Sequence, residues 1–326
     1  MPAEWARHER TLMAWPCRIE LWGAQLERAR REYVATANAV AAFEPVTMVC
    51  AGQEHAAQAR AALAGEVEIV VLPIDDSWLR DSGPIFVLDG DGRRAGVHFR
   101  FNAWGEKFPP WDKDAAVGGM LIERLGDPEY DAPFVLEGGA INVDGEGTLL
   151  TTEQCLLNPN RNPSLSREQI EQGLRDHLGV ERVVWLGRGL AEDRDTDGHV
   201  DLIAAFTRPG QVLLQAAGPG NPNHEPMLEN RERLQDAGID VVDFPVLPYQ
   251  KVDGEQVACS HLNFYLCNGA VIVPVADQPT DAEALERIAA AYPEREVIGV
   301  PGVTIAFGGG GPHCITQQVP AAVSGR

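Results

Sequence analysis

The chain has 326 residues, of which 44% are hydrophobic and 23% are charged, as is typical of a globular protein. Its formal net charge of −21 at pH 7 argues against nucleic acid and against acidic membrane surfaces as partners, because the phosphates of both would be repelled. The same charge raises the local concentration of small cations, so it favours a cationic small molecule as the ligand.

The sequence contains no apolar run near the roughly 20 residues that a membrane-spanning helix needs. The first ten residues also lack the apolar segment of a signal peptide, so we expect a cytoplasmic protein. The six cysteines include no C-x-x-C pair and predict neither a disulfide framework nor a zinc site. Cys314 differs from the others because its neighbours are glycine, proline and histidine.

The predicted elements form a repeat. Strand, turn, strand, helix and strand follow one another, and first strands begin near residues 139, 199 and 262, which gives a period of about 60 residues. Complete units are expected at 139–186, 199–244 and 262–300; another begins at 82–88, and a partial one at 11–50 is completed by 308–319. Helices are expected at 24–43, 116–125, from Ser166, at 225–237 and at 281–291.

Five such units with short connections predict a closed ring in which the ends of equivalent strands meet near one axis. The fold class is therefore α/β, a five-bladed propeller of ββαβ-type repeats, and residues 1–326 are expected to form a single catalytic domain.

Two segments place polar side chains at predicted strand entrances. In 78–84 (WLRDSGP), Asp81 lies at the start of a strand with Trp78 three residues earlier. In 195–201 (DTDGHVD), an extended strand would turn His199 and Asp201 to the same face, which suits acid–base chemistry beside a cation. Taken singly, each segment also fits an ordinary turn or strand end.

The segment 308–314 (GGGGPHC) presents one thiol on a backbone that glycines leave bare, where a small planar substrate can approach closely. Glu137 lies at a further strand entrance. In a closed ring, Asp81, Glu137, His199 and Cys314 would all lie where the strand ends meet near the axis. This shared position favours one common site over four unrelated turn residues.

Four segments in order, 78–84, 137–143 (EGGAINV), 196–201 (TDGHVD) and 309–318 (GGGPHCITQQ), resemble signature segments of agmatine deiminases. These enzymes belong to the guanidine-modifying superfamily, which has the five-bladed pentein fold. The likeness extends over nearly the whole chain. Two positions depart from the family pattern: Gly311-Pro312 stands before His313, and Leu202 follows Asp201, where the family usually has asparagine.

The resemblance implies hydrolysis of agmatine to N-carbamoylputrescine and ammonia, a step of polyamine metabolism and putrescine biosynthesis. Cys314 would attack the guanidinium carbon and form a covalent S-alkylthiouronium. Asp81 and Asp201 would hold the guanidinium, and His199 would act as acid and then as base.

In the same scheme Glu137 would orient His199, Trp78 and Trp104 would line the channel or stack on the cation, and Gly310 would contact the substrate. No metal or organic cofactor is expected, and the family suggests a homodimer.

Three alternatives remain. The first is a deiminase or amidinotransferase of the same superfamily that acts on peptidyl-arginine or a specialised metabolite; an α-carboxylate would need an arginine, for which Arg194 is the candidate. The second is a metal-dependent ureohydrolase, because 197–201 matches D-x-H-x-D, although no second acidic cluster accompanies it. The third, a binding module without activity, is disfavoured because every catalytic position is filled.

Overall fold

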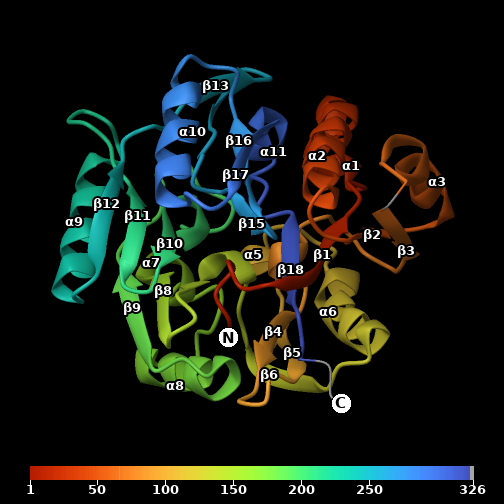
Figure 1. The fold of residues 1–326 in the computed structure, drawn as a ribbon, viewed down its shortest axis with the longest axis horizontal. Helices are drawn as coiled ribbons and strands as arrows, with labels where there is room; N and C mark the ends of the chain where they lie inside the picture. The colour runs from red at the N-terminus through yellow and green to blue at the C-terminus, as the bar shows by residue number, and fades with distance from the viewer. Residues whose placement is uncertain (66, 324–326) are drawn as a thin grey trace.

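Small mixed sheets surround one axis in the computed structural model, which describes residues 1–65 and 67–323 (Figure 1). In four sheets the first strand pairs antiparallel with the second, and the second pairs parallel with the third. These sheets are β4 (Ile85–Leu88), β5 (Arg94–Arg100) and β6 (Glu129–Val135); β7 (Asn142–Val143), β8 (Thr148–Thr152) and β9 (Arg182–Leu186); β10 (Ala204–Arg208), β11 (Gln211–Gln215) and β12 (Asp240–Phe244); and β15 (Tyr265–Cys267), β16 (Ala270–Val275) and β17 (Glu296–Pro301).

The fifth sheet joins the two ends of the chain, as the sequence predicts. Its order is β18 (Thr316–Pro320), β1 (His8–Ala14), β2 (Val46–Cys50) and β3 (Val67–Val71), and β1 is antiparallel to β18 but parallel to β2. Figure 1 shows β18, in blue, beside β1, in red. The ring is therefore closed by backbone hydrogen bonds between segments about 300 residues apart in sequence.

One long helix joins the two parallel strands of each unit and lies at the periphery (Figure 1). These helices are α2 (Leu26–Ala41), α6 (Asp112–Leu125), α8 (Arg167–Leu178), α9 (His224–Asp236) and α10 (Thr280–Ala291). The capping box predicted at Ser166 is confirmed, because its hydroxyl accepts from the amide of Gln169 and the Gln169 side chain accepts from the amide of Ser166. The pentein-type α/β fold is thus confirmed.

Elements that the repeat does not predict are mostly short. Besides β3, they are α1 (Ile19–Trp22), α3 (Gln53–Ala62), α4 (Leu79–Ser82), α5 (Ala103–Glu106), α7 (Glu153–Leu156), α11 (Val303–Phe307), the hairpin of β13 (Tyr249–Val252) and β14 (Glu255–Ala258), and the 3₁₀ turns η1 (Gly23–Gln25), η2 (Gly138–Ala140) and η3 (Val200–Leu202). Within the described residues, no helix combines the length and apolar character needed to cross a bilayer.

The expected strand over 199–206 is wrong in its first half. Asp197 and Gly198 have φ of 63° and 91°, which reverses the chain before His199, and Asp193 accepts hydrogen bonds from the amides of Gly198 and His199. Asp201 then lies in η3, and the strand begins only at Ala204. The strands expected from 82, 139 and 262 likewise begin later, at Ile85, Asn142 and Tyr265.

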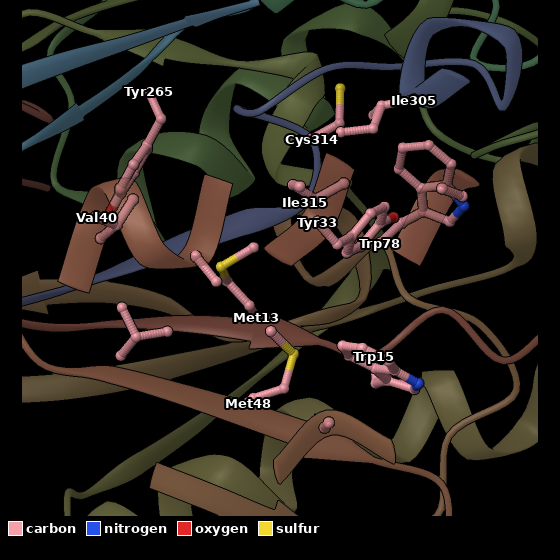
Figure 2. Close-up of a cluster of buried hydrophobic side chains, with 14 of the residues drawn as sticks. Met13, Trp15, Tyr33, Val40, Met48, Trp78, Tyr265, Ile305, Cys314 and Ile315 are labelled. Atoms are coloured by element: carbon pink, nitrogen blue, oxygen red, sulfur yellow. The ribbon is translucent and has the colours of Figure 1, made fainter. Parts of the chain in front are cut away.

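The largest apolar cluster fills the space between α2 and the sheet of β1 and β2. Figure 2 shows Met13, Tyr33 and Met48 in this cluster, together with Trp78 and Cys314. Burying such side chains is the main favourable contribution to folding. The same packing fixes the backbone of the segments that carry Trp78 and Cys314.

Candidate active site

The candidate site is built from the segments that precede the first strand of each unit. Asp81 precedes β4, Glu137 precedes β7, His199 precedes β10, Asn263 precedes β15 and Cys314 precedes β18. Because the units are arranged around one axis, these segments come together although they are far apart in sequence. The predicted site residues therefore do come together, but they lie on helical turns and loops and not on extended strands.

Gly139 marks the point at which three of the predicted side chains meet. A Cβ atom on this residue would lie 2.5 Å from Nδ1 of His199 and 2.9 Å from both Oδ2 of Asp201 and Oδ1 of Asp81. No larger residue fits there. The Gly139 amide also donates to Oδ1 of Asp81 at 2.9 Å.

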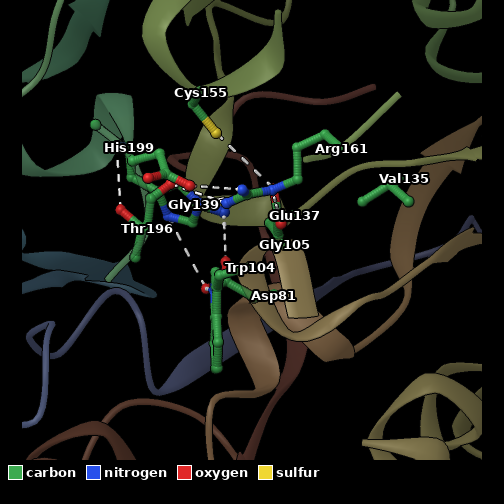
Figure 3. Close-up of polar contacts among 12 residues, drawn as sticks. Asp81, Trp104, Gly105, Val135, Glu137, Gly139, Cys155, Arg161, Thr196 and His199 are labelled. Atoms are coloured by element: carbon green, nitrogen blue, oxygen red, sulfur yellow. Dashed lines mark hydrogen bonds and ion pairs between the residues drawn. The ribbon is translucent and has the colours of Figure 1, made fainter. Parts of the chain in front are cut away.

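Asp81 is positioned by an unusual left-handed segment. Nε1 of Trp104 donates to Oδ2 of Asp81 at 2.9 Å (Figure 3). Ala103, Trp104, Gly105 and Glu106 all have φ between 50° and 88°, a conformation that costs energy for residues with a side chain. The pKa of the buried Asp81 is raised by desolvation, against the lowering effect of His199.

His199 is completely buried between two carboxylates (Figure 3). Its Nδ1 lies 3.9 Å from Asp81 and its Nε2 lies 3.8 Å from Glu137. Burial disfavours the imidazolium, but Asp81, Cys155 and Glu137 together outweigh burial and hold the pKa of His199 well above its usual value. The imidazole is therefore protonated at neutral pH, with Nδ1 on the side of Gly139.

Glu137 is held by Arg161, which the sequence does not indicate. Nε of Arg161 donates to Oε1 of Glu137 at 2.6 Å, and neither side chain is exposed. Burial disfavours the Glu137 carboxylate, but Arg161 and His199 lower its pKa below the usual range. Glu137 therefore keeps the negative charge that supports His199.

Cys314 is buried next to Asp201, with 3.4 Å between its sulfur and Oδ2 of Asp201. Burial, Asp201 and Asp81 raise the pKa of the thiol well above its usual value. Asn263 accepts from the Cys314 amide at 3.3 Å and donates to the Asp201 carbonyl at 3.2 Å, so it ties the two segments together. In the protein alone, Cys314 is therefore a neutral thiol.

A pocket opens beside Cys314. Its walls carry aromatic and acidic side chains together: Leu21, Asp76, Trp78, Asp81, Trp104, Phe108, Asp195, Thr196, Gly308, Gly309 and Cys314. Trp78 stacks on Trp22, with 5.7 Å between ring centroids. Gly310 lies directly against the sulfur of Cys314 and the ring of Trp78, since a Cβ there would lie 2.8 Å from each, and Gly308 and Gly309 line the pocket.

The D-x-H-x-D spacing does not assemble a binuclear metal site in the described residues. Asp197 points away from His199 and pairs with Lys107 at 2.7 Å and Arg161 at 2.8 Å. Glu137, Cys155 and His199 lie close enough together to share an ion, but Arg161 already occupies the Glu137 carboxylate. These donors therefore fit structural ion pairs better than a metal.

The comparisons with known proteins agree with this geometry. Residues 1–320 match the family model of Porphyromonas-type peptidyl-arginine deiminase. The chain is 43% identical to agmatine deiminase of Stutzerimonas stutzeri and 44% identical to that of Pseudomonas aeruginosa strain LESB58, and each alignment covers 98% of this chain and 95% of the relative.

Solved structures give the same result. The structure is similar to agmatine deiminase of Enterococcus faecalis with a TM-score of 0.94 at 34% identity, over 99% of this chain and 96% of the other. A cysteine-to-serine variant of C. jejuni agmatine deiminase with substrate bound gives a TM-score of 0.92 at 28% identity, with the same coverage. The chain therefore belongs to the Porphyromonas-type peptidyl-arginine deiminase family, among relatives that are agmatine deiminases.

Proposed function

We propose that this chain hydrolyses agmatine to N-carbamoylputrescine and ammonia. The observation that carries the proposal is the meeting of His199, Asp81 and Asp201 around Gly139, with the Cys314 sulfur 3.4 Å from Asp201. Relatives at 43% and 44% identity that are agmatine deiminases support the same reaction.

Asp81 and Asp201 would bind the planar guanidinium. Oδ1 of Asp201 is buried and has no hydrogen-bond partner among the described residues, so a donor from the substrate would satisfy it. Charge-assisted hydrogen bonds to two carboxylates would hold the guanidinium carbon within reach of Cys314.

The substrate would activate its own nucleophile. The Cys314 thiol is neutral because it lies beside Asp201 and Asp81 in a buried site. A guanidinium cation between these groups offsets their charge and lowers the pKa of the thiol, whose proton passes to solvent. The sulfur then attacks the guanidinium carbon and forms the C–S bond.

His199 would serve both halves of the reaction. As imidazolium it protonates the departing nitrogen, the C–N bond breaks, and ammonia leaves an S-alkylthiouronium on Cys314. The neutral imidazole then takes a proton from water, whose oxygen attacks the same carbon. The C–S bond breaks, the ureido product leaves, and Cys314 is restored.

The charge of the pocket favours agmatine over arginine. Asp76 and Asp195 line it besides Asp81, and no arginine or lysine does so among the described residues. Arg194, the candidate partner for an α-carboxylate, is exposed and lines a neighbouring groove instead. A distal ammonium suits these walls and a free carboxylate does not, which argues against free arginine as the substrate.

The test compares wild type, Cys314→Ala and Cys17→Ala with agmatine and with arginine, in the presence of EDTA. We expect ammonia and ureido product from wild type and Cys17→Ala with agmatine, and a loss of about a thousandfold or more in Cys314→Ala. Mass spectrometry of acid-quenched wild type should show the adduct on Cys314. Urea as the product, or activity lost on chelation, would overturn the mechanism, and no turnover of agmatine would overturn the substrate.

We also propose that residues 1–326 act as a single catalytic domain in a cytoplasmic homodimer. The continuity of the ring through β18 and β1 supports one domain, and the family likeness motivates the dimer. Light scattering on the purified protein at several concentrations measures the subunit number, and a monomeric mass would refute the dimer.

A further inference from the structure

An alternating chain of charges leads from the N-terminal segment to Asp201. Nδ1 of His313 lies 2.8 Å from Oδ2 of Asp201, and Nε2 of His313 lies 2.7 Å from Oε2 of Glu4. Arg80 completes the chain at 3.5 Å from Glu4. Its order is therefore Arg80, Glu4, His313, Asp201, with the sign changing at each step.

The His313 side chain faces away from the substrate pocket, although it precedes Cys314. It lines two other cavities together with Glu4, and Cys314 lines neither of them. Both ring nitrogens are within hydrogen-bond distance of carboxylate oxygens, so both carry protons and the ring is an imidazolium. Burial and Arg80 oppose that charge, but Glu4 and Asp201 outweigh them and raise the pKa of His313.

Glu4 is fixed on both of its oxygens. Oε1 accepts from the amide of Leu266 at 2.7 Å, and Oε2 faces His313 and Arg80. Burial opposes its charge, but His313 and Arg80 lower the pKa of Glu4 to about 2. A residue 309 positions from His313 in sequence thus supplies a permanent negative charge behind it.

We propose that Glu4 and His313 are positioning residues for the deimination proposed above. They clamp Oδ2 of Asp201, keep that carboxylate ionised, and leave Oδ1 of Asp201 directed at the guanidinium. The charged groups around His313 are Glu4 on the N-terminal segment, Arg80 on α4 and Asp201 on η3, with Cys314 next to it in the chain. Without the charge of Glu4, Arg80 and His313 face each other uncompensated and His313 loses its proton.

The test is a double-mutant cycle of Glu4→Gln and His313→Asn. Glutamine keeps an acceptor for the Leu266 amide but has no charge, and asparagine keeps a donor near Asp201 but has no link to Glu4. We expect Glu4→Gln to lower kcat/KM for agmatine about tenfold at neutral pH. The acidic limb of the pH profile of kcat/KM should move to higher pH by roughly one unit. Glu4→Asp should recover part of the loss.

In the His313→Asn background, Glu4→Gln should have no further effect. Glu9→Gln is the matched control, because Glu9 is a half-exposed carboxylate of β1 that pairs with Arg94, and it should leave the pH profile unchanged. The proposal would be overturned if the acidic limb of the kcat/KM profile did not move in Glu4→Gln. It would also be overturned if Glu4→Gln lowered kcat/KM equally in the His313→Asn background, since Glu4 would then have only a structural role.

An NMR titration separates this inference from the proposed function. The His313 resonances, assigned by their loss in His313→Asn, should titrate above the usual histidine pKa of about 6.5 in wild type and at lower pH in Glu4→Gln. This readout needs no turnover. If His313 titrates as expected and agmatine is not hydrolysed, the charge chain stands and the substrate assignment fails.

Discussion

The thiol of Cys314 lies 3.4 Å from Oδ2 of Asp201, and both side chains are buried. Burial together with this carboxylate raises the pKa of the thiol well above its usual value. In the proposed mechanism, this arrangement would keep the Cys314 thiol unreactive until a cation enters the site. Selectivity for guanidinium over neutral electrophiles would follow from that dependence.

Replacing Asp201 should uncouple thiol reactivity from turnover. Asp201→Asn removes a negative charge beside Cys314, so the thiol pKa falls and alkylation by iodoacetamide at pH 8 should become roughly tenfold faster. Agmatine turnover should be lost in the same variant. The rate is measured by peptide mass mapping of Cys314 in a Cys17→Ala background, and slower or unchanged alkylation would contradict the role given to Asp201.

Trp104 should matter through its indole N–H as well as its ring. Trp104→Phe removes the donor to Asp81 and should lower kcat/KM by roughly tenfold to a hundredfold, the range for a hydrogen bond to a charged group. Trp78→Phe is the matched comparison, because Trp78 stacks on Trp22, and its loss should be smaller. Equal losses in the two variants would show that only aromatic lining is needed.

Asp195 should contribute to affinity for the distal ammonium of agmatine. It lines the pocket, and burial and the neighbouring Asp193 raise its pKa. Asp195→Asn should raise KM for agmatine about fivefold with little change in kcat, as expected for loss of a partly screened charge pair. Asp91→Asn in the exposed β4–β5 turn is the control, and a fall in kcat at constant KM would place Asp195 elsewhere in the mechanism.

Asp114 should make the protein less stable as the pH rises. Its Oδ1 accepts from the amides of Asp75 and Asp76, yet burial raises its pKa from 3.8 to about 7. Because the folded-state pKa lies above the unfolded value, the folded protein binds the proton more tightly. This contribution to stability is present below about pH 4 and is lost as the pH rises through about 7.

Asp114→Asn keeps an acceptor for both amides and cannot ionise. Relative to wild type it should gain roughly 1–3 kcal/mol in unfolding free energy between pH 5 and pH 8, measured by urea denaturation. The exposed Asp112 on the same helix provides the control as Asp112→Asn. Parallel pH curves for Asp114→Asn and wild type would show that Asp114 is already ionised when folded.

Much of the ring could be predicted from the sequence because its signals are local. Turn residues such as Gly145 and Gly210, which adopt positive φ, and the capping box at Ser166 act within a few residues of themselves. The predicted order of strand, turn, strand, helix and strand is therefore confirmed in complete units such as 139–186. The site residues could be named for the same reason, since Asp81, Glu137, His199 and Cys314 recur at one position of the repeat.

Side-chain contacts that no sequence pattern reveals, some of them between distant segments, decided the rest. The extended conformation expected for His199 gave way to a turn that Asp193 caps through its side chain, and the left-handed run around Trp104 is held by Asp81 and Asn160. Arg161 reaches Glu137 only when the loop that follows β8 folds back over the same unit, and Glu4 reaches His313 only when the ring closes. The tertiary structure also decides the protonation states of Cys314 and His199, because these depend on burial and on neighbours that are remote in the chain.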